Sequence, residues 1–218
     1  MDPAEYAGQT WNLVSDLASR FRFAVRLSVH LPAQQVAAGL KALFQRYGAP
    51  LFLKRDNGSN LVNAAVDAVL AEFSVIPLNS PRYYPQYNGA IENGQRELKA
   101  ELRRWAAWPL AWAVRWARVR LNRRPRRCLH GHNAQDVFLQ GNPVFQAEYT
   151  MARRQAIKSW IEQTTRLILT NVENGNRRAH DAAWRQAVEM WLLEHDFLEV
   201  LQRKKCYPIF DESGFKWR

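Results

Sequence analysis

Three acidic residues in this chain have the type and surroundings that metal-assisted phosphate chemistry needs. Asp56 follows the short apolar run 51–53, and Glu92 lies 36 positions later, at the start of a basic helical pattern. Asp2 supplies a third carboxylate near the start of the chain. Mg²⁺ prefers hard oxygen ligands and keeps some of its waters, so two or three carboxylates suffice to hold it. Two such ions about 4 Å apart can support phosphodiester cleavage and joining.

The local patterns around the two later acids suit such a site. A strand ending just before Asp56 would hold one ligand firmly, whereas the polar loop 83–89 would let Glu92 adjust. Clustered carboxylates repel one another unless a cation lies between them, which favours a metal over a purely structural role. An Asp and a Glu at this spacing are common by chance, however, so the flanking residues must carry the specificity.

The flanking residues resemble a known family. The matching stretches are Asp56-Asn57-Gly58-Ser59, the Pro-Gln-x-x-Gly-x-x-Glu arrangement at 85–92, and the run from Asn122-Arg123-Arg124-Pro125 to Asn133-Ala134. Together with the early Asp2, they resemble the catalytic core of retroviral-integrase-like DDE transposases, of the type found in bacterial insertion elements. The resemblance covers residues 2–140 and implies DNA integration or transposition by strand transfer from a DNA 3′-hydroxyl.

The resemblance also implies site residues, cofactors and partners. The catalytic and metal-binding triad would be Asp2, Asp56 and Glu92, holding two Mg²⁺ or Mn²⁺ ions. The residues expected to approach DNA are Tyr83, Gln86, Asn88, Arg96, Lys99 and Arg103. The partners would be the element ends and a target duplex, bound by a homo-oligomer.

The first strand departs from the family pattern. The family places a hydrophobic half-strand before the first Asp, whereas here only Met1 precedes Asp2. We therefore expect a first strand that is truncated at the N-terminus and a weakly anchored Asp2, because chain termini are poorly ordered unless tied down.

The charge balance indicates a polyanionic partner. Lys plus Arg number 31 against 20 Asp plus Glu, a net charge of +11. Arginines crowd one region, namely Arg103, Arg104, Arg115, Arg118, Arg120, Arg123, Arg124, Arg126 and Arg127. This pattern favours phosphate contacts and DNA binding, with binding to an anionic membrane surface as the alternative. No apolar run is long enough to span a membrane, so we expect a cytoplasmic, nucleoid-associated protein.

The hydrophobic pattern predicts an α/β fold. Strands are expected at 10–15, 22–29, 51–54 and 75–78, with helices from Pro32 to Gly48 and over 60–73. This order is that of an RNase H-like mixed sheet flanked by helices, to which the resemblance also points. We expect a catalytic core at 1–145 and a small, mainly helical C-terminal extension at 146–218, with helices around 157–168 and 184–192.

The helix expected from Asn88 carries two adjacent stripes. Ile91, Gln95, Leu98, Leu102 and Trp105 form the apolar stripe, and Glu92, Arg96, Lys99 and Arg103 form the charged one. Such a charged stripe is normally a solvated face, but an acid at its head favours a DNA-facing edge. In the next helix, expected at 108–122, Trp112 and Trp116 lie on a second face, where we expect packing rather than base stacking.

Two further alternatives stay open at the level of sequence. Cys128, His130 and His132 offer metal ligands within five residues, but no fourth ligand accompanies them, so a connecting loop is the better interpretation. The chain could be an active transposase or a catalytically inactive DNA-binding fragment of one. An RNase H-like nuclease fits less well, because the basic stripe after Glu92 favours sustained binding of DNA ends.

Overall fold

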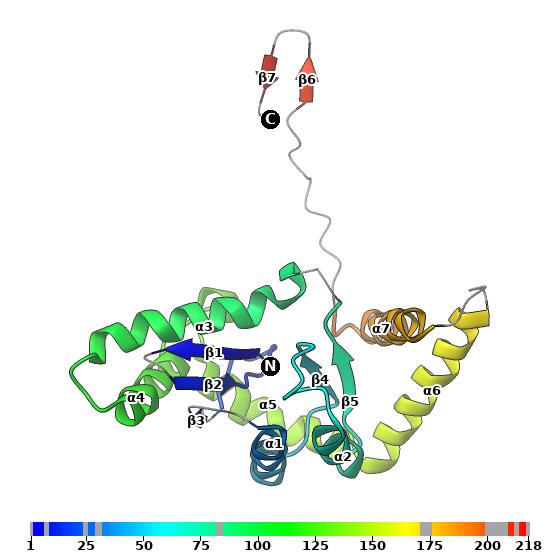
Figure 1. Cartoon of the computed structure of the whole chain (residues 1–218), viewed down its shortest axis with the longest axis horizontal. Coiled ribbons are helices and arrows are strands. Elements are labelled where there is room, and N and C mark those ends of the chain that lie inside the picture. Colours follow the sequence, from blue (N-terminus) through cyan, green and yellow to red (C-terminus); the bar gives the residue numbers. More distant parts are fainter. Residues whose placement is uncertain are drawn as a thin grey trace.

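A computed structural model (Figure 1) describes residues 2–6, 9–23, 26–28, 32–81, 85–170, 176–198, 209–211 and 214–216. Side chains are described over 13–23, 32–81, 87–170 and 176–198. The strands are β1 (Asp2–Tyr6), β2 (Gln9–Leu13), β3 (Arg26–Ser28), β4 (Phe52–Arg55), β5 (Ile76–Asn79), β6 (Ile209–Asp211) and β7 (Gly214–Lys216).

The helices take up more of the described chain than the strands. They are α1 (Ala33–Tyr47), α2 (Ala64–Glu72), α3 (Gly89–Leu102), α4 (Leu110–Arg123), α5 (Ala134–Glu148), α6 (Met151–Thr170) and α7 (Arg177–Glu194). Short 3₁₀ helices are η1 (Pro85–Asn88), η2 (Arg103–Trp105) and η3 (Arg127–Leu129). None of the described helices is long and apolar enough to cross a membrane.

The strands form both antiparallel and parallel pairs. β1, β2 and β3 make an antiparallel sheet in the order β1-β2-β3, while β4 and β5 pair in parallel. β6 and β7 make a separate antiparallel hairpin. The α/β class with both strand orientations agrees with the sequence prediction. Among the described residues, however, no ladder joins the antiparallel sheet to the parallel pair, so the single mixed sheet is only partly present.

Helices cover both faces of the β4–β5 pair. Side chains alternate between the two faces of a strand. Leu53 of β4 points into a core built by α1 and α2, whereas Phe52 packs with Ile76 and Leu78 of β5 against α6 and α7. Both faces are therefore removed from water, which suits parallel strands.

A second core joins the antiparallel sheet to α3 and α4. Leu13 at the end of β2 is fully buried and packs with Ile91 and Leu98 of α3 and with Val114 of α4. The apolar stripe predicted on α3 is thus confirmed at its buried positions. Figure 1 shows α3 and α4 together at one side of the molecule.

Helices α6 and α7 belong to the same packed body as the β4–β5 pair. Arg154 of α6 is buried and donates hydrogen bonds to Tyr149 O (2.7 Å), Pro50 O (2.6 Å) and Ala49 O (2.6 Å). Helix α5 continues through the expected boundary at 145/146. The division into a core and an extension stays a prediction, but α6 and α7 complete the hydrophobic core next to β4.

Several predicted boundaries shift for local reasons. The helix predicted over 60–73 begins at Ala64, because residues 58–62 form a turn and the Asn63 side chain caps the helix by accepting a hydrogen bond from Val66 N (3.0 Å). The helix predicted to end at Gly48 is confirmed. Gly48 has φ of 80° and lies against the Gln146 side chain, so only glycine fits there.

The strands predicted over 10–15 and 22–29 are shorter than expected. They become β2 and β3, with a single bridge between Ser15 and Arg22 beyond the end of β2. The Asp16 carboxylate accepts hydrogen bonds from the Ser19 amide (2.7 Å) and hydroxyl (2.5 Å), which closes a turn in place of further pairing.

Candidate nucleic-acid and metal site

Asp56 lies directly after the carboxyl end of β4, where the sequence places it. Its side chain is half-buried, and within the described side chains it makes no hydrogen bond or ion pair. The preceding Arg55 is buried, and its guanidinium contacts Asn79 Oδ1 (2.8 Å), Leu61 O (2.9 Å) and Asp67 Oδ1 (2.7 Å). The backbone that carries Asp56 is therefore held firmly while its carboxylate is left available.

Buried Ser80 connects the end of β4 to the start of α3. The Ser80 amide donates to Arg55 O (3.0 Å), and the Ser80 hydroxyl donates to Asn88 Oδ1 (2.7 Å) with Arg55 O 3.1 Å away. Asn57 Nδ2 in turn donates to Ser80 O (2.7 Å). These contacts tie the residues on both sides of Asp56 to Asn88, one helical turn before Glu92.

Glu92 lies in the first turn of α3 and is exposed. A carboxylate in this position is favourable because the helix dipole is positive at the N-terminus. Asn88 occupies the N-cap position, as predicted, but its side chain makes no capping hydrogen bond. The reason is tertiary: its Oδ1 accepts from Ser80 instead.

Asp2 is the first residue of β1, and only its backbone is described. Asp2 pairs with Leu13 across the antiparallel ladder. Leu13 packs against α3 so closely that its Cδ2 would lie 3.5 Å from a Cβ added at Gly94, two residues beyond Glu92. The strand that carries Asp2 thus runs next to the N-terminal half of α3. Of the other predicted residues, Tyr83 and the Gln86 side chain lie outside the described residues.

The cations of α3 line a shallow depression on its outer face. Its volume is about 260 Å³, and its walls are Glu92, Gln95, Arg96, Lys99, Ala100 and Arg103. Arg96 donates to Asn93 Oδ1 (2.7 Å). The acid and the cations predicted to share one helix edge therefore do so in space. Among the residues with described side chains, no three His, Cys, Asp or Glu residues cluster as a metal site, and Asp2 is outside that set.

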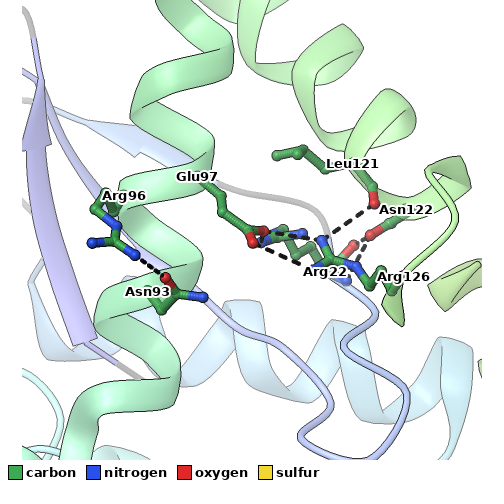
Figure 2. A network of polar contacts seen from close by, with 7 residues as sticks. All are labelled: Arg22, Asn93, Arg96, Glu97, Leu121, Asn122 and Arg126. Atoms are coloured by element: carbon green, nitrogen blue, oxygen red, sulfur yellow. Dashed lines mark hydrogen bonds and ion pairs between the residues drawn. The ribbon is translucent and has the colours of Figure 1, made fainter. Parts of the chain in front are cut away.

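A polar network fixes α3 from its other side (Figure 2). Glu97 of α3 pairs with Arg22, and Arg126 Nη2 lies 3.0 Å from Glu97 Oε2. Asn122 of α4 closes the network by exchanging two hydrogen bonds of 2.9 Å with the Arg22 backbone. Burial raises the pKa of Glu97, but hydrogen bonds from Arg126 and Arg22 outweigh it, so the pKa lies below its ordinary value.

Comparison with known proteins identifies a solved structure with a similar fold. No family model matches the chain, and no curated protein matches it. Among solved structures, the chain is similar to the catalytic core domain of BIV integrase. The sequence identity is 23% and the TM-score 0.57, over 69% of this chain and 96% of that one. The chain has an integrase-like fold.

Within this integrase-like fold, α7 contributes residues that the sequence did not indicate. Glu189 of α7 accepts a hydrogen bond from Tyr87 OH (3.0 Å), and Arg185 Nε donates to Asn79 O (3.3 Å). The Lys54 ammonium lies 3.8 Å from the centre of the Tyr87 ring and donates to Tyr87 O. Burial raises the pKa of Tyr87, and Glu189 adds to the effect. Helix α7 thus holds η1, the segment that precedes Glu92, through the hydrogen bond between Glu189 and Tyr87.

Two other sequence predictions have mixed outcomes. Cys128 is exposed, and among the described residues it belongs to no group of three metal-ligating side chains. The interpretation of its loop as a connection stays a prediction. Trp112 and Trp116 were expected to pack, but this prediction was wrong: both are exposed. Ala113, Val114 and Ala117, on another face of α4, lie in the core instead. The core covers the face of α4 that carries Val114, Ala117 and Leu121, and it leaves the face with the two tryptophans exposed.

Proposed function

We propose that this protein is a DDE-type transposase or integrase of the bacterial insertion-element type, which catalyses metal-dependent DNA strand transfer. The observation that carries the proposal is the set of hydrogen bonds made by buried Ser80. It ties the end of β4, where Asp56 lies, to the start of α3, where Glu92 lies, within an integrase-like fold.

The carboxylates present fit a Mg²⁺ or Mn²⁺ site. Asp56 and Glu92 offer hard oxygen donors that no described side chain pairs with. Asp2, on the strand next to α3, would supply the third carboxylate. When bound, two metal ions would neutralise phosphate charge and lower the pKa of the attacking 3′-hydroxyl. In this proposal the chain's own contribution is to hold the three carboxylates at fixed positions.

The basic edge of α3 would hold the DNA next to these acids. Arg96, Lys99 and Arg103 follow Glu92 along one exposed face, at a spacing suited to successive phosphates. Tyr83, Gln86 and Asn88 precede Glu92 in the chain and are proposed to contact the DNA ends. We propose that a homo-oligomer binds the element ends and the target duplex.

A second candidate is DNA binding without catalysis. It is favoured by the cations of α3, which are available to phosphates without any metal in the acidic site. The two candidates differ in what the acids do. Strand transfer needs Asp56 and Glu92 to bind metal, whereas binding alone is improved when acids next to a phosphate are neutralised.

Metal binding and activity together test the proposal. We expect the protein to bind Mn²⁺, measured by calorimetry, and to nick or join a labelled duplex when Mn²⁺ is present. Asp56→Asn and Glu92→Gln should each weaken Mn²⁺ binding at least about 10-fold and abolish the reaction. Glu162→Gln, an exposed substitution on α6, is the matched control and should change neither.

Mn²⁺ binding, activity and duplex affinity without metal together separate strand transfer from DNA binding alone. If Glu92→Gln leaves Mn²⁺ binding intact, the assigned metal site is wrong. If the unaltered protein binds duplex but neither binds Mn²⁺ nor reacts, and Glu92→Gln tightens binding, the inactive DNA-binding protein is the correct assignment.

A further inference from the structure

Two arginines share one carboxylate on the inner side of α3. Figure 2 shows Arg96 on one side of this helix and Glu97 on the other, where Arg22 and Arg126 meet it. Glu97 Oε2 accepts a hydrogen bond from Arg22 Nη2, and Arg126 Nη2 lies 3.0 Å from the same oxygen. Within the described part of the chain, Arg22 and Arg126 are the charged groups that act on Glu97. The cluster therefore has one positive charge in excess.

This excess charge lies among buried groups. The Arg22 side chain is only 4% exposed, and that of Arg126 is 12% exposed. Among the described residues, Arg22 Nε, Arg22 Nη1 and Arg126 Nε are buried and have no hydrogen-bond partner. A buried N–H group without an acceptor is unfavourable, and a buried charge without a counter-charge is more so. Three donors on two neighbouring guanidiniums thus call for an acceptor, and preferably for a charged one.

The backbones that carry the two arginines are fixed. Arg22 N donates to Asn122 Oδ1, and Arg22 O accepts from Asn122 Nδ2, both at 2.9 Å. Asn122 is itself buried. Arg126 N donates to His132 O (3.0 Å), which closes the loop after α4. The guanidiniums therefore stay close together in spite of their repulsion, because moving apart would break their bonds to Glu97.

We propose that Arg22, Arg126 and Glu97 form a binding site for a small inorganic anion, with chloride as the representative ion. The anion accepts hydrogen bonds from the guanidinium N–H groups that Glu97 does not use, and it brings the cluster to charge balance. It thereby fastens α3 to the loop that begins at Arg126. The site is independent of the proposed strand transfer, because it lies on the other side of α3 and includes none of the proposed metal ligands.

The surroundings of Arg22 suit a monatomic anion. Helix α3 presents no side chain to this guanidinium at Gly94. A Cβ added there would lie 3.9 Å from Arg22 Nη2 and 3.5 Å from Leu13 Cδ2, which are ordinary van der Waals distances. The free space on this side is therefore about as large as one methyl group. Chloride is similar to a methyl group in size, whereas phosphate and sulfate, each with four oxygens, are larger.

Charge favours an anion over an ordered water molecule at this place. Water can accept hydrogen bonds from buried N–H groups, but it carries no charge. Burial lowers the pKa of Arg22, the hydrogen bond to Glu97 raises it, and the nearby Arg126 lowers it further. The two arginines therefore repel each other through the protein interior. An anion between them offsets this repulsion, whereas a water molecule leaves it in place.

Thermal unfolding tests the proposal when chloride replaces gluconate at constant ionic strength. Gluconate is too large for the site, so the exchange separates chloride binding from general screening. Mass action stabilises the folded protein that binds the ion. At about ten times its dissociation constant, chloride should raise the melting temperature by roughly 3–6 °C.

Two matched variants show whether this rise comes from the cluster. Arg126→Gln removes the excess charge and leaves Arg22 and Glu97 as a balanced pair, so the melting temperature of this variant should no longer depend on chloride. Arg153→Gln removes one cation from the exposed pair of Arg153 with Glu148 (3.0 Å) and should keep the full dependence.

Crystals of the unaltered protein grown with sodium bromide locate the ion directly. The anomalous signal of bromide should lie in contact with the Arg22 and Arg126 guanidiniums. The proposal is wrong if the unaltered protein shows no chloride dependence, since a bromide peak would then be an adventitious ion only. It is also wrong if Arg126→Gln keeps the full dependence, or if the position is occupied by water without an anomalous signal or by a carboxylate of another copy of the chain.

Discussion

At the scale of single residues, Glu97 connects α3 to two arginines outside the helix. Its carboxylate faces two guanidiniums, and the Arg22 side chain is only 4% exposed. Charged groups this deeply buried need their partners, because an unpaired buried charge is far more costly than the pair. Glu92 and the cations beyond it belong to the same helix, so the position of the candidate site depends on this network.

Replacing Glu97 with Gln should destabilise the protein by about 3 kcal/mol, the lower end of the range for a broken buried pair, because Glu97 is 30% exposed. For a chain of this size that corresponds to a fall of roughly 6–12 °C in the melting temperature. Circular dichroism recorded during thermal unfolding measures this fall in melting temperature.

The same substitution should change how the free energy of unfolding depends on pH in the acid range. Because the folded pKa of Glu97 is lowered from its ordinary 4.5, its contribution is complete above that value and is lost as the pH falls through the folded pKa. Glu97→Gln should therefore lose less stability on acidification than the unaltered protein. Glu162→Gln is the control. If the unaltered protein and both variants lose the same stability on acidification, the assigned role of Glu97 is contradicted.

At the scale of elements, α7, the last described helix, contacts both β5 and the segment that precedes Glu92. Trp184 Nε1 donates to Pro77 O (2.8 Å), and Glu189 accepts from Tyr87 OH. The first contact fixes α7 on β5, and the second fixes η1 on α7. Helix α7 thus positions the segment that precedes Glu92 without itself supplying a proposed ligand.

Tyr87→Phe should lower kcat for the proposed strand transfer about 10-fold with little change in KM. The ring is kept, but the hydrogen bond that holds η1 is removed, and small displacements of catalytic groups slow reactions strongly. Single-turnover kinetics measure the rate of strand transfer, and calorimetry measures Mn²⁺ affinity. Glu194→Gln, on the exposed end of α7, is the control. Equal kcat in Tyr87→Phe and the unaltered protein would show that α7 serves stability alone.

At the scale of the whole molecule, a net charge of +11 predicts salt-sensitive binding to any polyanion. Duplex binding depends on which of these cations are free of ion pairs and where they lie. Arg96, Lys99 and Arg103 surround the depression next to Glu92, whereas other arginines pair with Glu97 and Glu101. The cations on the outer side of α3 are therefore available to a duplex, whereas the arginines paired with Glu97 and Glu101 are already engaged.

The triple variant Arg96→Ala, Lys99→Ala and Arg103→Ala should reduce the salt slope of duplex binding by about 2.7, close to 0.9 for each phosphate that is no longer neutralised. Anisotropy across a salt series measures the slope. The matched control removes the same charge from exposed positions on α6 and α7, with Arg166→Ala, Arg177→Ala and Arg178→Ala. Equal slopes for the two triple variants would show that the α3 cations form an ordinary solvated face.

Features that depend on neighbours along the chain could be predicted from the sequence. The periodicity of 91–102 predicted α3 and its buried stripe, and the flanks of Asp56 and Glu92 predicted an integrase-like core, in agreement with the fold. Helix caps and turn residues explain most of the boundaries that shifted. These features follow from short-range hydrogen bonds and side-chain spacing, which a sequence shows directly.

The groups that meet across long separations in the chain could not be predicted and are seen only in the folded molecule. Ser80 and Asn88 join the strand that precedes Asp56 to the helix of Glu92, and Glu189 reaches Tyr87 from 102 residues away. The exposure of Trp112 also depends on which face of α4 the core covers. The physical reason is common to all three: a side chain's partner or its access to water is set by the packing of whole elements, which no local pattern encodes.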